Sequence, residues 1–214
     1  MKYKNLLKEL KKREFRVTIF GSARMKKGSK EYNEVYNLAK MVGLRGIDLV
    51  TGGGPGIMEA AGAGHKIGSK NNDAHTIGLN IKLPHEQRMN PYVDVKKQFT
   101  RFSDRLDNFM LFSNAIVVAH GGVGTILELF YSWQLMQVKR ICHIPIILVG
   151  EQWIGLMKWL RKEPLRRKFF NEEDLELLFL AKNSEEAIRV IDEAHDAFKN
   201  GDKNFCLNYK KFKI

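Results

Sequence analysis

The sequence is poor in the residues that build disulfide-rich, metal-binding or membrane-spanning proteins. Its 214 residues include only two cysteines, Cys142 and Cys206, too few for a disulfide framework. We therefore expect reduced thiols and a cytoplasmic protein. No Cys/His cluster has the spacing of zinc ligands, so no metal is expected. No run of about 18 apolar residues occurs, so neither a membrane span nor a membrane partner is expected.

Acidic residues are outnumbered by basic ones. The chain carries 36 Lys and Arg against 24 Asp and Glu, a formal net charge of +12. Much of the excess lies in residues 2–16, 158–168 and 203–213. A basic surface suits either a nucleic acid or small anionic substrates. Basic and aromatic residues do not interleave as they do in single-strand binders, which argues against a nucleic-acid partner.

Apolar segments of two periodicities alternate along the chain. Short apolar runs predict strands at residues 15–20, 47–51, 76–81, 115–119, 144–149 and 175–180. Helical spacing predicts helices at residues 32–42, 57–66, 99–112, 125–138, 153–161 and 184–198, the last one beginning at Ser184. Residues 82–97 read as a polar loop.

This alternation predicts an α/β fold. Buried strands separated by helices form a mostly parallel sheet with helices on both faces. No repeat or low-complexity linker divides the chain, so we expect one domain over residues 1–214. It would carry a basic N-terminal extension, 1–14, and a basic C-terminal tail, 200–214.

Glycine clusters follow three of the expected strands, at residues 21–22, 52–56 and 121–124. Ligands bind at the carboxyl ends of the strands in such sheets, so these clusters are expected to converge. Taken singly, each could be only a tight turn between a strand and a helix. Residues 52–56, GGGPG, do not fit the dinucleotide fingerprint, and no P-loop sequence is present.

The stretch HGGVGTILE at residues 120–128 is the most informative of the three. An apolar run leads into a glycine-rich turn that opens a helix, and unpaired backbone N–H groups at a helix start suit a phosphate. Glu128 lies within the first turns of that helix. The stretch therefore predicts a phosphate site with a carboxylate beside it.

Four segments together resemble the LOG family, whose members were long labelled lysine decarboxylases. They are residues 20–24 (FGSAR), 51–61 (TGGGPGIMEAA), 77–87 (IGLNIKLPHEQ) and 121–128 (GGVGTILE). The resemblance implies a Rossmann-like three-layer sandwich and a homodimer. It also implies a phosphoribohydrolase that splits a nucleoside 5′-monophosphate, such as AMP or a cytokinin riboside monophosphate, into base and ribose 5-phosphate. No cofactor is implied, and no residue marks a Schiff-base lysine for decarboxylation.

The resemblance also implies the site residues. Arg105 and Glu128, 23 positions apart, match the family's catalytic pair. The remaining matches are expected to bind the nucleotide and its phosphate, and they are Gly21, Ser22, Gly52, Gly53, Gly54, Gly56, Met58, Gly121, Gly122, Gly124 and Thr125.

Glu128 is the expected general base and would stabilise positive charge on the ribose. Arg105 would hold the phosphate or assist departure of the base. The alternatives are a solvated helix-start glutamate at 128 and a surface ion-pairing arginine at 105.

The sequence departs from the family at four positions. His120 replaces a usual proline before the glycine motif, and we expect its ring either to bind the anion or merely to fill the loop. Leu106 replaces a lysine, whereas Leu127 and Tyr131 replace acidic residues. These changes keep a second interpretation open, a nucleotide- or cofactor-binding protein without hydrolysis, as in molybdenum-cofactor carriers of the same fold.

Overall fold

The computed structural model describes residues 14–83 and 88–201. Its core is one seven-stranded sheet. The strands are β1 (Arg16–Phe20), β2 (Asp48–Thr51), β3 (Thr76–Ile81), β4 (Val95–Phe99), β5 (Ala115–Val118), β6 (Ile146–Val149) and β7 (Leu178–Ala181). Every pairing between neighbouring strands is parallel, which confirms the predicted α/β class.

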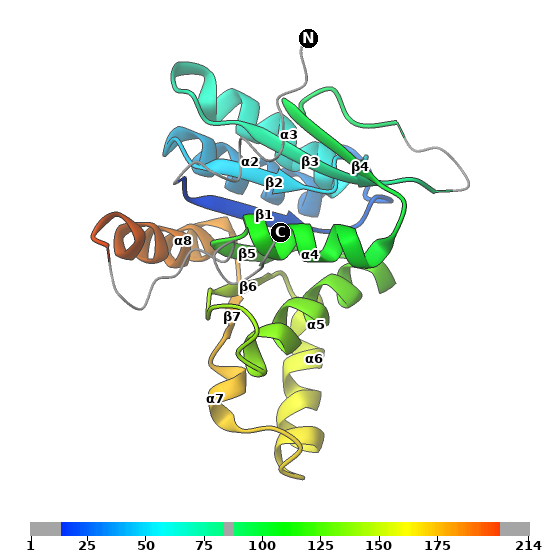
Figure 1. Ribbon diagram of the computed structural model, residues 1–214, viewed down its shortest axis with the longest axis vertical. Helices are drawn as coiled ribbons and strands as arrows, with labels where there is room; N and C mark the ends of the chain where they lie inside the picture. Colours follow the sequence, from blue (N-terminus) through cyan, green and yellow to red (C-terminus); the bar gives the residue numbers. More distant parts are fainter. Residues whose placement is uncertain (1–13, 84–87, 202–214) are drawn as a thin grey trace.

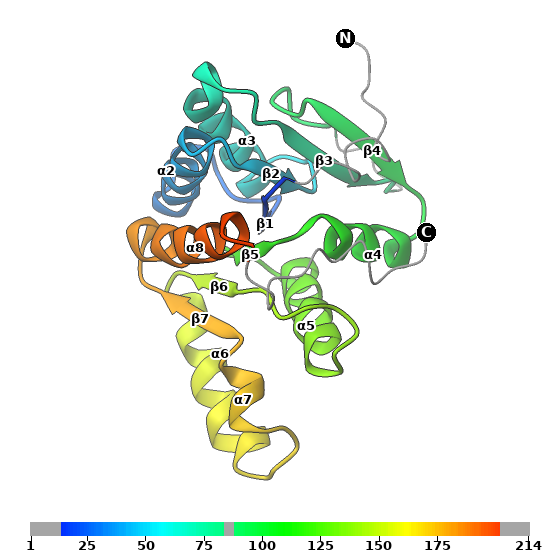
Figure 2. The ribbon, with the colours of Figure 1, turned by 60° about the vertical axis from the view of Figure 1, so that its left-hand side comes forward.

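Helices cover both faces of this sheet (Figure 1; Figure 2). One face carries α2 (Lys30–Leu44), α3 (Ile57–Gly68) and α8 (Ser184–Lys199). The other carries α4 (Phe102–Phe112), α5 (Val123–Gln137), α6 (Gln152–Leu160) and the short α7 (Glu172–Leu175). A 3₁₀ turn, η1 (Ser69–Asn71), follows α3, and a π-helical turn, η2 (Arg161–Leu165), follows α6. The layers match the expected Rossmann-like three-layer sandwich.

The strand order β4-β3-β2-β1-β5-β6-β7 places the first strand in the middle of the sheet. The chain moves outward from β1 to β4, then returns to the other side of β1 and moves outward again to β7. The strand order therefore reverses between β1 and β5. Ligands of such sheets bind at the carboxyl ends of the strands that flank this reversal.

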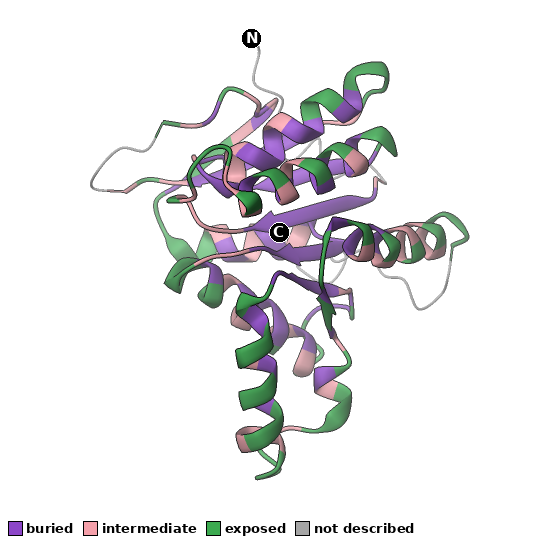
Figure 3. Ribbon diagram, turned by 180° about the vertical axis from the view of Figure 1, so that it is seen from behind, coloured by how far each residue is buried: buried purple, intermediate pink, exposed green. Residues whose placement is uncertain are grey.

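Alternate residues of each central strand pack into two separate hydrophobic cores, one on each face of the sheet. In β5, Ile116 and Val118 face the α4–α5–α6 side, whereas Ala115 and Val117 face the α2–α3–α8 side. Strands buried on both faces need nearly continuous apolar sequence, which is what made them recognisable. Figure 3 shows the resulting contrast between buried strands and the exposed outer faces of the helices.

The predicted loop over residues 82–97 is wrong at its C-terminal end. Residues 95–99 (VKKQF) form β4, which pairs along β3 from Ile77↔Val95 to Ile81↔Phe99. Only its two end residues are buried, and Lys97 and Gln98 point to solvent. Charged residues on a sheet edge prevent further pairing, but they also remove the apolar run that signals a strand. Phe99 therefore belongs to β4, and the helix begins at Phe102.

The last strand also begins later than predicted. Leu175 ends the short helix α7, which starts with an Asn171–Asp174 capping box, so the last strand begins at Leu178. Helix α8 begins at Ser184, as predicted, and its N-cap is Asn183, whose side chain accepts a hydrogen bond from the Glu186 N–H.

The expectation of reduced thiols is wrong for Cys142, which is disulfide-bonded. Cys206 lies outside the described residues, as do the extension and tail except for Glu14, Asn200 and Gly201. In the described part of the chain, no helix is both long and apolar enough to cross a membrane.

Candidate functional site

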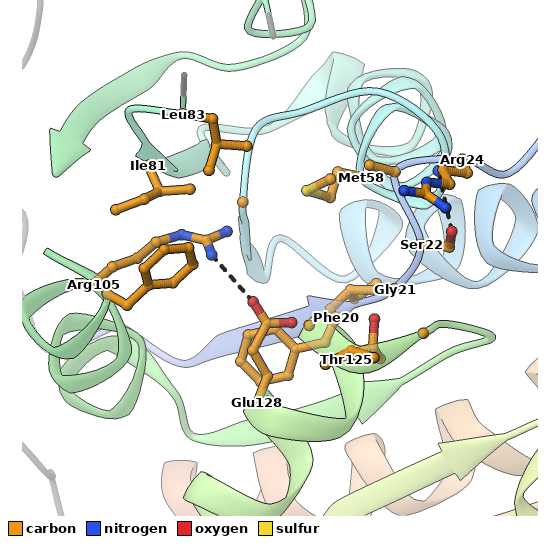
Figure 4. A pocket seen from close by; sticks show the side chains of 17 residues that line it. Phe20, Gly21, Ser22, Arg24, Met58, Ile81, Leu83, Arg105, Thr125 and Glu128 are labelled. Atoms are coloured by element: carbon orange, nitrogen blue, oxygen red, sulfur yellow. Dashed lines mark hydrogen bonds and ion pairs between the residues drawn. The ribbon is translucent and has the colours of Figure 1, made fainter. Parts of the chain in front are cut away.

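The loops after β1, β2 and β5 meet around a cavity of about 460 Å³ at the carboxyl ends of these strands (Figure 4). The lining includes nine of the residues expected to form the site. They are Gly21, Ser22, Gly52, Met58, Arg105, Gly122, Gly124, Thr125 and Glu128. The cavity thus lies at the position where the strand order reverses.

The loop after β1 connects the other two loops. The Ser22 N–H donates to the carbonyl of His120, 2.9 Å away, and the Ser22 carbonyl accepts from the N–H of Ile57, also at 2.9 Å. A side chain at Gly21 would collide with Ile57, the first residue of α3. Glycine at this position lets the start of α3 approach the end of β1.

The loop after β2 makes room for Arg105. A Cβ atom on Gly52 would collide with the Arg105 guanidinium and would stand 2.6 Å from the Met58 sulfur. The glycine therefore leaves a space that these two side chains occupy. Gly56, with a φ of +66°, starts α3 and packs directly against the backbone of Ser22 and Ala23.

The loop after β5 presents a helix start to the cavity. Gly122 caps α5 without a side-chain hydrogen bond to the first turn. A Cβ atom at Gly122 or Gly124 would meet no protein atom within 4 Å. Unpaired N–H groups at a helix start, together with open space beside them, suit a phosphate. The side chain of Thr125 lies at the same end, in the room left by Gly121.

Arg105 on α4 and Glu128 on α5 form an ion pair at the cavity, with 3.3 Å between Nη1 and Oε1 (Figure 4). Arg105 Nε also donates to the carbonyl of Leu79 at 2.7 Å. The guanidinium carbon lies 4.9 Å from the centre of the Phe109 ring, which packs edge-on against Phe20. Arg105 is thus held by Leu79 and Phe109 while one edge of its guanidinium faces Glu128.

Burial controls the charge of this pair. Both side chains are about nine-tenths buried. Burial raises the pKa of Glu128 from 4.5 to about 7, and the Arg105 charge opposes that rise. Burial likewise lowers the pKa of Arg105, against the effect of Glu128. A carboxyl that titrates near neutrality can exchange protons readily, which suits a general acid or base.

Five of the expected site residues do not line the cavity, namely Gly53, Gly54, Gly56, His120 and Gly121. Their contacts are structural. Asn90 holds the second loop, since its N–H donates to the Gly53 carbonyl and its side-chain amide to the Gly54 carbonyl, both at 2.8 Å. Gln152 holds Gly121 by hydrogen bonds to both its N–H and its carbonyl.

His120 fills space within the protein. A Cβ atom on Gly150 would stand 2.7 Å from His120 Nε2 and 2.8 Å from Nδ1, so the ring occupies the place of a side chain at residue 150. The geometry favours the loop-filling alternative over direct anion binding. The residue still reaches the site through its carbonyl, which accepts from Ser22.

The cavity also contains residues that the sequence did not single out. Arg24 adds a cation from the first loop, and an apolar wall is formed by Ile81, Leu83 and Phe102. Arg24 lies two positions after Ser22, and its N–H donates to the Ser22 hydroxyl at 3.1 Å. Its position close behind the glycine-serine turn could have identified Arg24 as a candidate site residue from the sequence. The apolar wall comes from the end of β3 and the start of α4, where no polar motif marks it.

The departures from the family pattern have separate surroundings. Leu106 is buried in the protein, and Leu127 is partly exposed on α5. Tyr131 donates a hydrogen bond to the carboxylate of Asp107 on α4. On α5, Leu129, Trp133 and Met136 lie in this chain's own core. Among the described residues, no three His, Cys, Asp or Glu side chains form a group that could hold a metal ion.

A family model described as "Possible lysine decarboxylase" matches residues 58–191, more than half of the chain. The chain belongs to this family. It is the LOG family that the sequence motifs resemble.

Part of the chain is also similar in sequence to an Escherichia coli enzyme. The pyrimidine/purine nucleotide 5′-monophosphate nucleosidase of Escherichia coli K12 is 29% identical over 126 residues. The match covers 56% of this chain and 28% of that protein, so this LOG-family chain spans less than a third of its relative's length.

Solved structures of the same fold include two molybdenum-cofactor proteins. One is the cofactor-binding protein of Rippkaea orientalis, with a TM-score of 0.64 and 20% identity, covering 84% of this chain and 96% of that one. The other is the cofactor carrier of Chlamydomonas reinhardtii, with a TM-score of 0.63 and 21% identity, covering 86% and 99%. At these identities the likeness shows the Rossmann-like fold alone.

Proposed function

We propose that this chain is a nucleoside 5′-monophosphate phosphoribohydrolase. The reaction breaks the bond between C1′ of the ribose and a ring nitrogen of the base, with water as the second reactant. The observation that carries the proposal is the buried Arg105–Glu128 pair, which lies in one cavity with the open start of α5. AMP and cytokinin riboside monophosphate are the first substrates to test.

The two halves of the site would bind different parts of the nucleotide. The N–H groups at residues 122–125 and the Thr125 hydroxyl would bind the 5′-phosphate. The apolar wall of Ile81, Leu83 and Phe102 would contact the base. The ribose would then lie between the two, beside the Arg105–Glu128 pair.

In the proposed mechanism, the base leaves with the electron pair of the C1′–N bond, and positive charge builds on the ribose. The Glu128 carboxylate stabilises that charge and accepts a proton from the attacking water, whose oxygen bonds to C1′. Glu128 then passes this proton to the nitrogen of the departing base, so that the hydroxyl of the water is on C1′ and its proton is on the base. Arg105 assists departure of the base and favours the ionised form of Glu128, in opposition to burial. The products are free base and ribose 5-phosphate.

The test is incubation of the protein with a panel of purine, pyrimidine and cytokinin riboside monophosphates, followed by chromatography of base and ribose 5-phosphate. We expect release of base by the wild type and none by Glu128→Gln, a substitution that keeps the shape of the side chain. Ribose 5-phosphate should still bind the variant, which shows that its site is folded. Wild-type rates of base release by Glu128→Gln would reject the assignment.

The second candidate is a carrier that binds a nucleotide or a phosphorylated cofactor without hydrolysis. The uncharged Leu106 and Leu127 favour it, since the family usually has charged residues there. Tight binding of nucleotides that all remain intact in the panel would establish this function in place of the first.

The proposed enzyme acts as a homodimer, as the family resemblance implies, and in the cytoplasm, which was the expectation from the low cysteine content. Exposed apolar side chains at the start of α5, Val123, Ile126 and Leu127, provide a contact surface near the cavity. Sedimentation of the purified protein at micromolar concentration tests the dimer, and a monomer under these conditions contradicts it.

A further inference from the structure

Helices α4 and α5 are joined by two polar contacts close to each other in sequence. One is the ion pair between Arg105 and Glu128. The other lies two residues further along α4 and three further along α5, where the Tyr131 hydroxyl donates to the Asp107 carboxylate. The second contact involves no cavity-lining residue. The Tyr131–Asp107 contact can therefore influence the position of the Arg105–Glu128 pair without itself contacting a ligand in the cavity.

The chemistry of the Tyr131–Asp107 contact makes it a strong one. A hydroxyl that donates to a carboxylate forms a charge-assisted hydrogen bond, about twice as strong as a neutral one. Burial, the hydrogen bond and the charge of Asp107 all raise the pKa of Tyr131, so the phenol keeps its proton. The Tyr131 ring packs against the hydrophobic core on the α4–α5–α6 side of the sheet. The Tyr131 end of the contact is thus fixed by packing.

The Arg105–Glu128 pair depends on the spacing of the same two helices. Its single direct contact, at 3.3 Å, is at the long end of hydrogen-bonding distance. Arg105 is anchored on its own side by Leu79 and Phe109. Within the described residues, Arg105 is the charged group that acts on Glu128. A small movement of α5 away from α4 would therefore separate the pair.

We propose that Tyr131 is a positioning residue, which sets the distance between Arg105 and Glu128 through its hydrogen bond to Asp107. The inference rests on the proposed function for its catalytic consequence. It also accounts for the tyrosine itself. An acidic residue at 131, the usual choice in the family, would face Asp107 with a like charge, whereas a phenol donates to it.

The test compares four variants by steady-state kinetics. Tyr131→Phe and Asp107→Ala each remove the hydrogen bond, and we expect each to lower kcat about tenfold, because small misplacements of catalytic groups are costly. KM should stay within about twofold. The double variant should lose no more than either single one, since both remove the same contact. Asp107→Asn keeps an acceptor oxygen and should retain most of the activity.

A second readout separates positioning from simple support of the fold. Loss of the contact should move the acid limb of the kcat–pH profile to higher pH, because Arg105 lowers the pKa of Glu128 and would then lie further away. Asp104→Asn is the matched control. It removes a carboxylate from the exposed start of the same helix and should leave kcat and the pH profile unchanged.

Additive losses in the double variant, a loss confined to KM, or an acid limb that does not move upward would overturn the proposal. Thermal melts of each variant identify any that do not fold. If the wild type itself releases no base, the proposed function fails, but the positioning role remains testable. The Glu128 carboxyl is then titrated by NMR in wild type and Tyr131→Phe, and an unchanged or lower pKa rejects the role.

Discussion

The guanidinium of Arg105 lies 3.3 Å from the carboxylate of Glu128, although the two residues are 23 positions apart on different helices. Both are nearly buried, and burial outweighs attraction, so the pKa of Glu128 rises to about 7. This balance between burial and attraction should make the reaction rate depend on pH. It should also lower the free energy of unfolding at pH values where Glu128 is ionised.

The reaction rate should depend on the ionisation of Glu128. A carboxyl with a pKa of about 7 is mostly protonated at pH 6 and mostly ionised at pH 8. Since the proposed base must be ionised, kcat should fall about tenfold for each pH unit below 7. Initial rates of base release between pH 5 and 9 measure this. A rate that stays constant from pH 5 to 7 would remove Glu128 from the role of base.

The same carboxyl should make stability depend on pH. Folding raises its pKa from 4.5 to about 7, so the folded state binds the proton more tightly than the unfolded chain. Its contribution is therefore fully present below pH 4.5 and is lost as pH rises through 7. Glu128→Gln, which cannot ionise, should not lose stability in this way as the pH rises.

Urea unfolding of wild type and Glu128→Gln gives the measurement. The variant should be the more stable protein at pH 8, by about 3 kcal/mol at most, and the difference should shrink toward pH 5. A difference that is the same at both pH values contradicts the linkage.

Gly52→Ala should damage the site without unfolding the protein. The added methyl group would collide with the guanidinium of Arg105, a flexible side-chain end that can move aside. We expect kcat to fall about tenfold as Arg105 leaves Glu128. Gly155→Ala on α6 is the control. Its methyl group meets no atom within 4 Å, so it should leave kcat unchanged. Equal kinetics for the two variants would mean that Gly52 has no part in placing Arg105.

Gly124→Ala should weaken phosphate binding. The residue is in the first turn of α5, where alanine favours the helix, and its methyl group would extend into open space at the cavity. We expect the thermal midpoint to stay or rise, whereas the Kd for ribose 5-phosphate should increase at least about tenfold. Calorimetric titration measures the affinity, and an unchanged Kd would place the phosphate elsewhere.

The fold could be predicted because the central strands are apolar on both faces. Ile116 through Val118 and Ile146 through Leu148 read directly as strands. β4 was missed because its three middle residues are polar and only its ends, Val95 and Phe99, are buried. The sequence indicated each buried strand through its composition, whereas the edge strand depends on pairing with β3.

The site was only partly predictable for a similar reason. Glycines at strand ends follow from local pattern, so the convergence of Gly21, Gly52 and Gly122 could be expected. The position of Arg105 depends on contacts with Gly52 and Leu79, which no local pattern encodes, and it entered only through the family resemblance. The apolar wall had no polar marker. The burial that raises the pKa of Glu128 likewise required the three-dimensional structure.

The ring of His120 rests in the space that Gly150 leaves, and its carbonyl accepts the N–H of Ser22 at 2.9 Å. The loop after β6 is thereby connected mechanically to the cavity, although Gly150 does not line it. A side chain at 150 would push the ring and carry the displacement to the first loop. Residue 150 can therefore influence the shape of the cavity without lining it.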